Sequence, residues 1–277
     1  MTAPLLDRRP WHEGEIQARH LAGAPTIAPV IRTFITDQQK DFFAHLPMVF
    51  IAGLDAGGAP AASILRGAPG FAGSPEPRRM TIAARFPEGE RMTREAGAPF
   101  GLIAMDFSAR RRNRVNGRIA AASEGALSLA VDEAFGNCPK YIAPHALFAA
   151  SDDPGAWADL PALDGDARAL IERTETFFIA TRGPDGLDMS HRGGPPGFVA
   201  IDPSGALLIP DFPGNNYFNT FGNLLRDPRA ALLFIDFPAG RALHLAGRAR
   251  VALSEQQRFW VFVPETGRLL SAPPFGT

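Results

Sequence analysis

Three short blocks of sequence occur twice in this chain, in the same order, and this repeat limits the possible folds more than any other feature. The clearest block begins at Ser63 and again at Ser190, 127 residues later, and the two copies share Ser, Gly, Pro, Gly and Phe at matching positions. Such agreement is hard to attribute to composition, so we expect a duplicated domain. The three pairs are 49–52 with 177–180, 63–71 with 190–198, and 101–107 with 231–237.

Each copy is predicted to be a small antiparallel β-barrel. Its apolar runs are short, rich in β-branched and aromatic residues, and followed by Gly, Pro and Asp turns such as 55–58 and 184–186. Helical patterns are confined to the connections. The expected fold class is therefore mainly β, with two tandem barrels and short connecting helices. The helices are expected at 36–44, 166–174, 218–225 and 254–262.

A stretch rich in Pro, Gly and Asp, without sustained periodicity, separates the two copies and marks the domain boundary. We expect a first repeat at 1–150, a linker at 151–166 and a second repeat at 167–277. The alternative is one continuous barrel in which the similarity between the blocks is accidental.

Charge and cysteine content exclude several classes of function. The 277 residues include 28 Lys+Arg against 29 Asp+Glu, so long-range attraction to nucleic acid or to an acidic membrane is missing, and any anionic ligand must be held locally. The one cysteine, Cys138, forms neither an internal disulfide nor a multi-cysteine zinc site and fits a reducing compartment. Without an apolar leader or a run of membrane-spanning length, the chain is expected to be cytoplasmic.

The second repeat contains a segment that is crowded with asparagine. Asn215, Asn216, Asn219, Thr220 and Asn223 surround the predicted start of a short helix. A helix cap would explain one of these residues, but not five amide and hydroxyl groups among Phe, Tyr and Leu. Free N–H groups and the dipole at a helix start favour an anion. We therefore expect this segment to bind a phosphate.

A second candidate element is the block that begins at Ser190. Arg192 offers the fixed positive charge that a nearly neutral protein must supply locally, either to a ligand or to a surface salt bridge. Because Gly193 and Gly194 permit the close approach of a flat ring or a phosphate, we favour ligand contact. His191 has no second histidine or carboxylate at ligand spacing, so no metal site is expected.

The first repeat lacks the asparagine-rich segment and carries different charges. Glu88 and Glu90 stand near the matching position, where they would disfavour an anion. The stretch 108–117 is strongly basic, and it places Arg111, Arg112 and Asn113 on a predicted strand whose alternation sends side chains to both faces. Such a run is either a solvated face or a recognition surface.

Together these motifs resemble the pyridoxamine-5′-phosphate-oxidase-like superfamily of flavin-nucleotide-binding split barrels, and the resemblance spans nearly the whole chain. It is strongest to one subgroup of that superfamily. The shared motifs are Pro-Trp-His-Glu-Gly-Glu at 10–15, Arg-Arg-Arg-Asn-Arg-x-Asn-Gly at 110–117, Phe-Gly-Asn-Cys-Pro-x-Tyr at 135–141, Ser-His-Arg-Gly-Gly at 190–194 and Pro-Asp-Phe-x-Gly-Asn at 210–215.

The resemblance implies FMN as the cofactor, held between two split barrels that in the superfamily usually come from two subunits of a homodimer. Here the two repeats would supply both halves of one site, either as a monomer with an internal pseudo-dimer or within a homodimer. The second repeat would hold the phosphate, and the basic strand of the first would approach the flavin ring. The expected cofactor-binding residues are Ser190, His191, Arg192, Gly193, Asp211, Asn215, Asn216, Asn219, Thr220, Asn223, Arg111, Arg112 and Asn113.

The function that the resemblance implies is an FMN-dependent oxidoreductase of unknown substrate, with no catalytic residue assigned. The oxidase's own phosphate ligands have no clear match here, so pyridoxamine phosphate is not the expected substrate. One alternative is a non-catalytic flavin-binding or electron-transfer module that serves a separate reductase, because no acid/base pair is recognisable. Another is a haem-binding relative of the same barrel, for which His191 or His244 would have to be the axial ligand.

Overall fold

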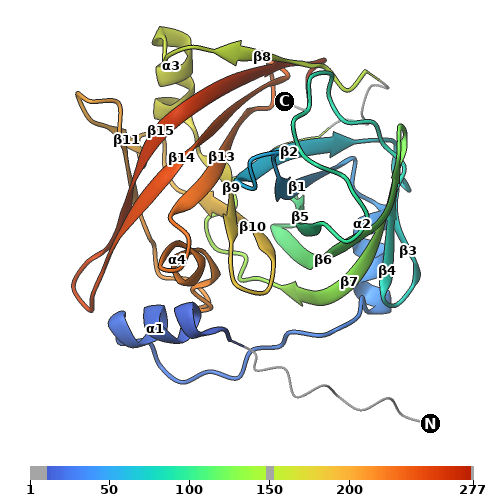
Figure 1. Cartoon of the computed structure of the whole chain (residues 1–277), viewed down its shortest axis with the longest axis horizontal. Coiled ribbons are helices and arrows are strands. Elements are labelled where there is room, and N and C mark those ends of the chain that lie inside the picture. The colour runs from blue at the N-terminus through green and yellow to red at the C-terminus, as the bar shows by residue number, and fades with distance from the viewer. Residues whose placement is uncertain (1–10, 148–152, 276–277) are drawn as a thin grey trace.

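Two antiparallel sheets form the two halves of the molecule (Figure 1). The structure is a computed structural model that describes residues 11–147 and 153–275. The first sheet contains β1 (Met48–Leu54), β2 (Pro60–Arg66), β3 (Ala72–Glu76), β4 (Arg79–Ile82), β5 (Pro99–Asp106), β6 (Arg111–Ser123) and β7 (Ala126–Gly136). The second contains β9 (Thr176–Arg182), β10 (Leu187–Gly193), β11 (Ala200–Ile201), β12 (Leu207–Pro210), β13 (Arg229–Asp236), β14 (Arg241–Leu253) and β15 (Arg258–Ser271).

The strand order of the two sheets is the same. It is β2-β1-β5-β6-β7-β4-β3 in the first sheet and β10-β9-β13-β14-β15-β12-β11 in the second, so each strand of the first repeat has a counterpart in the second. All pairings within both sheets are antiparallel. The chain is therefore mainly β and consists of two tandem split barrels, as the sequence repeat predicted.

The described residues form four short helices, two before the first strand and two between later strands. Two of them begin with reciprocal capping boxes, made by His12 with Glu15 and by Thr36 with Gln39, and the side chain of Asp164 caps a third. No helix in the described part of the chain has both the length and the apolar character needed to cross a membrane. The helices are α1 (Glu13–Leu21), α2 (Asp37–Ala44), α3 (Gly165–Arg173) and α4 (Asn219–Leu224).

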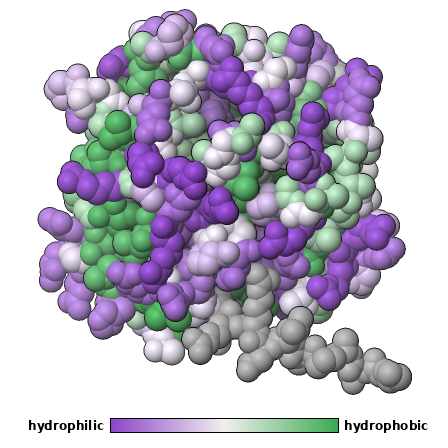
Figure 2. Space-filling view, viewed as in Figure 1, coloured by the Kyte–Doolittle hydropathy of each residue, from purple (hydrophilic) through white to green (hydrophobic). Residues whose placement is uncertain are grey.

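Each barrel has its own apolar core, and a third apolar cluster joins the two barrels. In that cluster equivalent residues of the two repeats meet: Phe50 stacks on Phe178 with ring centroids 3.6 Å apart, and Phe107 contacts Phe237 edge-on at 5.1 Å. Such aromatic pairs add about 0.5–1.5 kcal/mol beyond their area burial. The two repeats are thus packed against each other as an internal pseudo-dimer. Most side chains on the face of the molecule drawn in Figure 2 are hydrophilic.

Two segments differ from the simplest expectation. The stretch 151–166 includes β8 (Ala156–Leu160), which pairs with the end of β15, so its described part is more than a linker. The prediction of a helix at 254–262 is wrong. The hydroxyl of Ser254 accepts from the N–H groups of Gln256 and Gln257 in a turn, and from Arg258 onward buried and less buried side chains alternate as in a strand.

A candidate ligand site between the two repeats

A pocket opens between the two repeats, where β6 of the first repeat faces β10 and the start of α4 in the second. The first repeat contributes Ile103, Arg112, Arg114, Asn137, Lys140 and Tyr141 to its lining. The second contributes Ser190, His191, Arg192, Gly193, Phe198, Pro210, Asp211, Phe212, Gly214, Asn215, Asn216, Tyr217, Phe218, Asn219, Thr220, Phe221 and Arg258.

The alternation of β6 decides which basic residues reach this pocket. Arg112 and Arg114 line it, whereas Arg111 lies over the ring of Phe42, 5.5 Å from its centroid, and the Oδ1 of Asn113 accepts from Gln39 at 3.4 Å. Of the three residues expected from this strand, the structure therefore places Arg112 at the pocket and the other two on the opposite face. Sequence reasoning did not select Arg114, because the phase of the alternation depends on the register with the neighbouring strands.

Arg112 is a cation without a carboxylate partner among the described residues. Its Nη1 lies 2.5 Å from Nδ1 of His191. Burial lowers the pKa of Arg112 to about 10; Cys138 acts in the opposite direction, and the charges of Arg192 and Arg114 lower the pKa further. This arrangement leaves a positive charge at the pocket that an anionic ligand would neutralise.

His191 is held as a neutral imidazole beside that cation. A guanidinium has only donors, so Nδ1 of His191 accepts from Arg112, and Nε2 carries the proton and faces Oγ1 of Thr176 at 3.5 Å. Burial, and then the charges of Arg112 and Arg192, hold the pKa of His191 well below its usual value. Both ring nitrogens are thus engaged with protein groups, and His191 orients Arg112.

Arg192 both lines the pocket and forms a salt bridge. Its Nη1 donates to Asp211, and the other oxygen of Asp211 accepts from Arg258 at 2.7 and 3.1 Å. The guanidinium of Arg258 also lies over the ring of Phe218 at 4.9 Å. Asp211 is therefore clamped between two arginines, so its own charge is more than compensated. The sequence suggested either a ligand contact or a salt bridge for Arg192, and in the structure Arg192 can make both, because it binds Asp211 and also lines the pocket.

The asparagine-rich segment forms a strained loop at the edge of the pocket. Asn216 and Phe218 have φ of 58° and 59°, in the left-handed region that non-glycine residues rarely adopt. Phe218 is the N-cap of the six-residue α4 and makes no side-chain cap, so no asparagine caps this helix. Asn215 and Thr220 also line the pocket, whereas Asn223 lies outside its lining.

The loop is held from outside by the N-terminal segment, which sequence reasoning did not connect with the site. Arg19 donates to the backbone oxygen of Asn216, and the N–H of Val30 donates to the hydroxyl of Tyr217 at 3.1 Å. The ring of Trp11 contacts that of Tyr217 edge-on at 5.1 Å. Trp11, His12 and Glu15 belong to the motif at 10–15, and their partners lie about 200 residues away in the sequence.

Aromatic rings form another part of the pocket wall. Tyr141 and Phe212, from different repeats, are 5.2 Å apart at an interplanar angle of 31°, and the hydroxyl of Tyr141 donates to the backbone oxygen of Pro213 at 3.2 Å. Phe198 lies 6.2 Å from Phe212. These flat apolar surfaces beside arginines suit a ligand that has both a ring and an anionic group.

Several buried polar atoms at the pocket have no hydrogen-bond partner among the described residues. Native proteins leave few such atoms, and a cluster of them often marks a place where a ligand or water completes the bonding. In this protein half of those identified belong to pocket-lining residues. They are Nε of Arg114, Oδ1 of Asn137, Oγ of Ser190 and Nε of Arg192.

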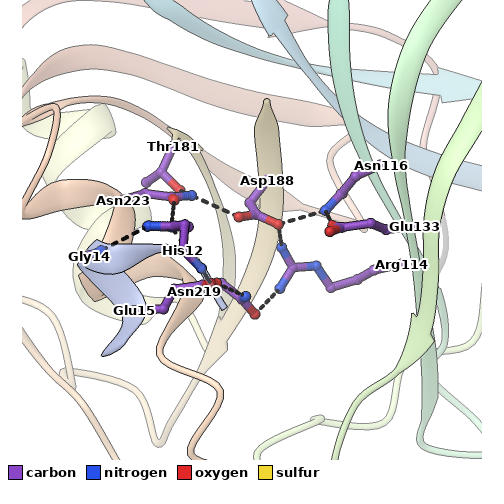
Figure 3. A network of polar contacts seen from close by, with 10 residues as sticks. All are labelled: His12, Gly14, Glu15, Arg114, Asn116, Glu133, Thr181, Asp188, Asn219 and Asn223. Carbon is purple, nitrogen blue, oxygen red and sulfur yellow. Dashed lines mark hydrogen bonds and ion pairs between the residues drawn. The ribbon is translucent and has the colours of Figure 1, made fainter. Parts of the chain in front are cut away.

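Behind the pocket, a network of polar contacts links the two repeats and α1 (Figure 3). At its centre, one oxygen of Asp188 accepts from Arg114 and from Asn116, the latter at 2.8 Å. The other oxygen accepts from Nδ2 of Asn223 at 2.7 Å, and Oδ1 of Asn223 accepts from His12 at 2.8 Å. Asn223 was expected to bind a cofactor, and the structure places it in this network instead.

Asn219 connects the network with the pocket. Its Oδ1 accepts from Arg114 at 3.1 Å, and its Nδ2 donates to the carboxyl of Glu15. Burial, Asp188 and Glu133 raise the pKa of Glu15 to about 8, although hydrogen bonds from His12 and Asn219 act in the opposite direction. At neutral pH, Glu15 is therefore mostly protonated.

The pseudosymmetric counterpart of this site, on the opposite side of the barrel interface, is filled by side chains of the protein. Ser63 corresponds to Ser190, and its hydroxyl donates to Glu90 at 2.5 Å. Trp157 donates to the same oxygen at 3.2 Å, and Arg268 lies over the Trp157 ring at 5.0 Å. Glu90 thus lies where the repeat predicted a carboxylate that disfavours an anion, while Glu88 takes part in a backbone bridge to β8.

One comparison with known proteins matches the second repeat. Residues 163–269 match the family model described as Pyridoxamine 5'-phosphate oxidase. An FAD-binding protein from Mesorhizobium loti is similar at 12% identity and a TM-score of 0.32, over 42% of this chain and 98% of its own. The FAD binding protein from Mycobacterium smegmatis is similar at 15% identity and a TM-score of 0.29, over 41% and 98%.

A NimC/NimA family protein from Clostridium acetobutylicum is also similar, at 16% identity and a TM-score of 0.30, over 39% of this chain and 84% of its own. No curated protein gives a significant match to the chain.

Proposed function

The second repeat of this chain belongs to the pyridoxamine-5′-phosphate-oxidase-like superfamily, and on that premise we propose that the pocket between the two repeats binds a flavin nucleotide, FMN. The observation that carries the proposal is the half-buried Arg112, a cation at the pocket with no carboxylate partner among the described residues. FMN is anionic, because its phosphate monoester carries about −1.5 to −2 charges at pH 7, so it matches a pocket with an excess of positive charge.

The charges of the lining support an anionic ligand. Asp211 is the one carboxylate among the described lining residues, and Arg192 and Arg258 both bind it. Arg112 and Lys140 add positive charge that no described carboxylate offsets at the pocket. Because the whole protein is nearly neutral, this local excess is a specific feature of the pocket.

The shape of the wall supports a ligand with a flat ring. We assign the phosphate and its polar chain to Arg192, Thr220 and the asparagine loop, and the ring to the side of Arg112 and His191. When bound, a flavin supplies one- or two-electron transfer. Arg112 would stabilise negative charge on the ligand, and His191 keeps the guanidinium in place.

The proposed activity is that of an oxidoreductase whose substrate is unknown. A non-catalytic flavin carrier for a separate reductase is the second candidate, and one observation favours it. Among the described lining residues, His191, Asp211 and Tyr141 are all engaged in protein contacts, so none of these three is free to act as an acid or base, which leaves Lys140 and Tyr217. A haem site is disfavoured because the Nε2 of His244 faces the N–H of Ala62 at 3.3 Å.

The first test is the colour of the purified protein. We expect flavin absorption bands and release of FMN on denaturation, in a ratio of one flavin per chain, because the counterpart site is filled by Glu90 and Trp157. A colourless protein that takes up no FMN on reconstitution would refute flavin binding, and two equivalent flavins per chain would refute the single-site arrangement.

A second test separates the enzyme from the carrier. The bound flavin is reduced, and its reoxidation is followed with oxygen and a panel of electron acceptors. An enzyme should accelerate reoxidation by at least one acceptor well beyond the rate of free FMN. If every acceptor reacts no faster than with free FMN, the carrier function is supported. Light scattering of the same sample shows whether the chain, which already contains both halves of the proposed site, also forms a homodimer.

A further inference from the structure

A second pocket adjoins the first and has the opposite charge. Asn219 lines both pockets, and the Arg114–Asp188 ion pair joins them, with Arg114 at the first and Asp188 at the second. No lysine or arginine is among the described residues that line the second pocket, which come from α1 with its N-cap, the segment after α1, β6, β7, β10, α4 and the turn before β10. Its carboxylates are Glu15, Asp132, Glu133, Asp185 and Asp188.

A buried acceptor without a partner also belongs to this pocket. Asn116 lines it and is 7% exposed. Its Nδ2 donates to Asp188 at 2.8 Å and to Glu133 at 3.1 Å, which fixes the orientation of the amide. Its Oδ1 has no hydrogen-bond partner among the described residues. A buried amide oxygen in this state requires a donor from outside the protein.

Glu15 lies among other charged groups at this pocket. Glu15, 5% exposed, is faced by Asp188 on β10, by Glu133 on β7 and by His12 on its own helix. Arg114 on β6 is bound to Asp188. Burial and the two neighbouring carboxylates raise the pKa of Glu15, so the site holds a proton where a cation would otherwise be favourable.

The arrangement of these groups favours an organic cation over a metal ion. No group of three or more His, Cys, Asp or Glu in the described chain is placed to hold a metal. An ammonium group has three N–H donors, so it can bond an amide oxygen and carboxylates at the same time. We propose that the second pocket binds a ligand through a protonated amine that donates to Oδ1 of Asn116 and to the surrounding carboxylates. This proposal holds whether or not the first pocket takes a flavin.

The proposal is tested by calorimetric titration of the full-length protein with putrescine, a diamine, and with 1,4-butanediol, its uncharged analogue of the same length. We expect saturable binding of putrescine and none of the diol. Below pH 8, binding should become up to about tenfold tighter per pH unit, since the cation prefers ionised Glu15. Titration near pH 7 in two buffers of different ionisation enthalpy should show release of about one proton per ligand.

Variants separate this site from general attraction between charges. Glu15→Gln keeps the helix cap, because Gln also serves at this position, and it should abolish the proton release and the pH dependence. Asp185→Asn, in an exposed turn, should weaken putrescine binding several-fold, and Glu124→Gln, in a distant turn, should change nothing. Equal binding of the diol, or binding unchanged in both pocket variants, overturns the proposal. The flavin content of the same samples is measured separately and reports on the first pocket alone.

Discussion

The buried carboxyl of Glu15 allows a quantitative prediction of how stability depends on pH. Its pKa is about 8 in the folded protein and 4.5 as the ordinary value, which we take for the unfolded chain. Between these values the folded state binds more protons than the unfolded state, so stability falls as the pH rises. The contribution of Glu15 to the free energy of unfolding is complete below pH 4.5 and is lost as the pH rises through about 8. With about 1.36 kcal/mol per pH unit, the wild type should lose about 4 kcal/mol between pH 5 and pH 9 through this group.

Glu15→Gln removes the titration and keeps the side chain's shape. The variant loses one acceptor for the N–H of His12 or the amide of Asn219, but that loss is independent of pH and cancels when the slopes are compared. The assay is urea unfolding of both proteins at half-unit steps from pH 5 to pH 9. Glu13→Gln, an exposed neighbour on the same helical turn, is the control and should keep the wild-type slope. If the unfolding free energies of wild type and Glu15→Gln run parallel across this range, the reasoning about Glu15 is refuted.

Three further predictions concern the pocket and its support. Arg112→Met should lower FMN affinity roughly 10- to 150-fold, which corresponds to the loss of a charged hydrogen bond of about 1.5–3 kcal/mol, and should not destabilise the flavin-free protein. Fluorescence titration with FMN measures the affinity, and Arg111→Met, on the opposite face of the strand, is the control. Gly14→Ala would place a Cβ 2.2 Å from the backbone oxygen of Gly222, so unfolding by urea should show a loss of about 1–3 kcal/mol; no loss would contradict the close packing of α1 on α4. Trp157→Ala should lower the thermal midpoint but leave FMN affinity within about twofold, and a large change in affinity would argue against the assignment of the flavin to one site only.

The duplicated architecture could be predicted from the sequence because its signal is local and repeated. The apolar runs 49–52 and 177–180 lie in the matching strands β1 and β9, and the turns after them form hairpins. The expected helix at 254–262 failed for a local reason as well. Trp260 and Phe262 are both buried, a spacing of two that a strand satisfies, and Ser254 begins a turn instead of a helix.

The site could be predicted only in part. Ser190 and Arg192 of the second repeat, which line the pocket, could be proposed from the sequence because they lie in motifs. Arg112 and Arg114 face the pocket and Arg111 does not, because the register of β6 with its neighbouring strands decides which of its side chains point to each face. Composition and spacing do not encode that register. The roles of the N-terminal segment could not be predicted, since its contacts with the asparagine loop join residues about 200 positions apart.

By itself, the sequence determined that this chain is a duplicated, mainly β protein with a basic strand in one repeat and an asparagine-rich loop in the other. Only the tertiary structure decided that these elements face each other across one pocket, and that an acidic pocket lies next to it. The physical reason is that strand periodicity and turn chemistry act between near neighbours. The bond between Arg114 and Asn219, 105 residues apart, exists only because two complete barrels pack through Phe50 and Phe178.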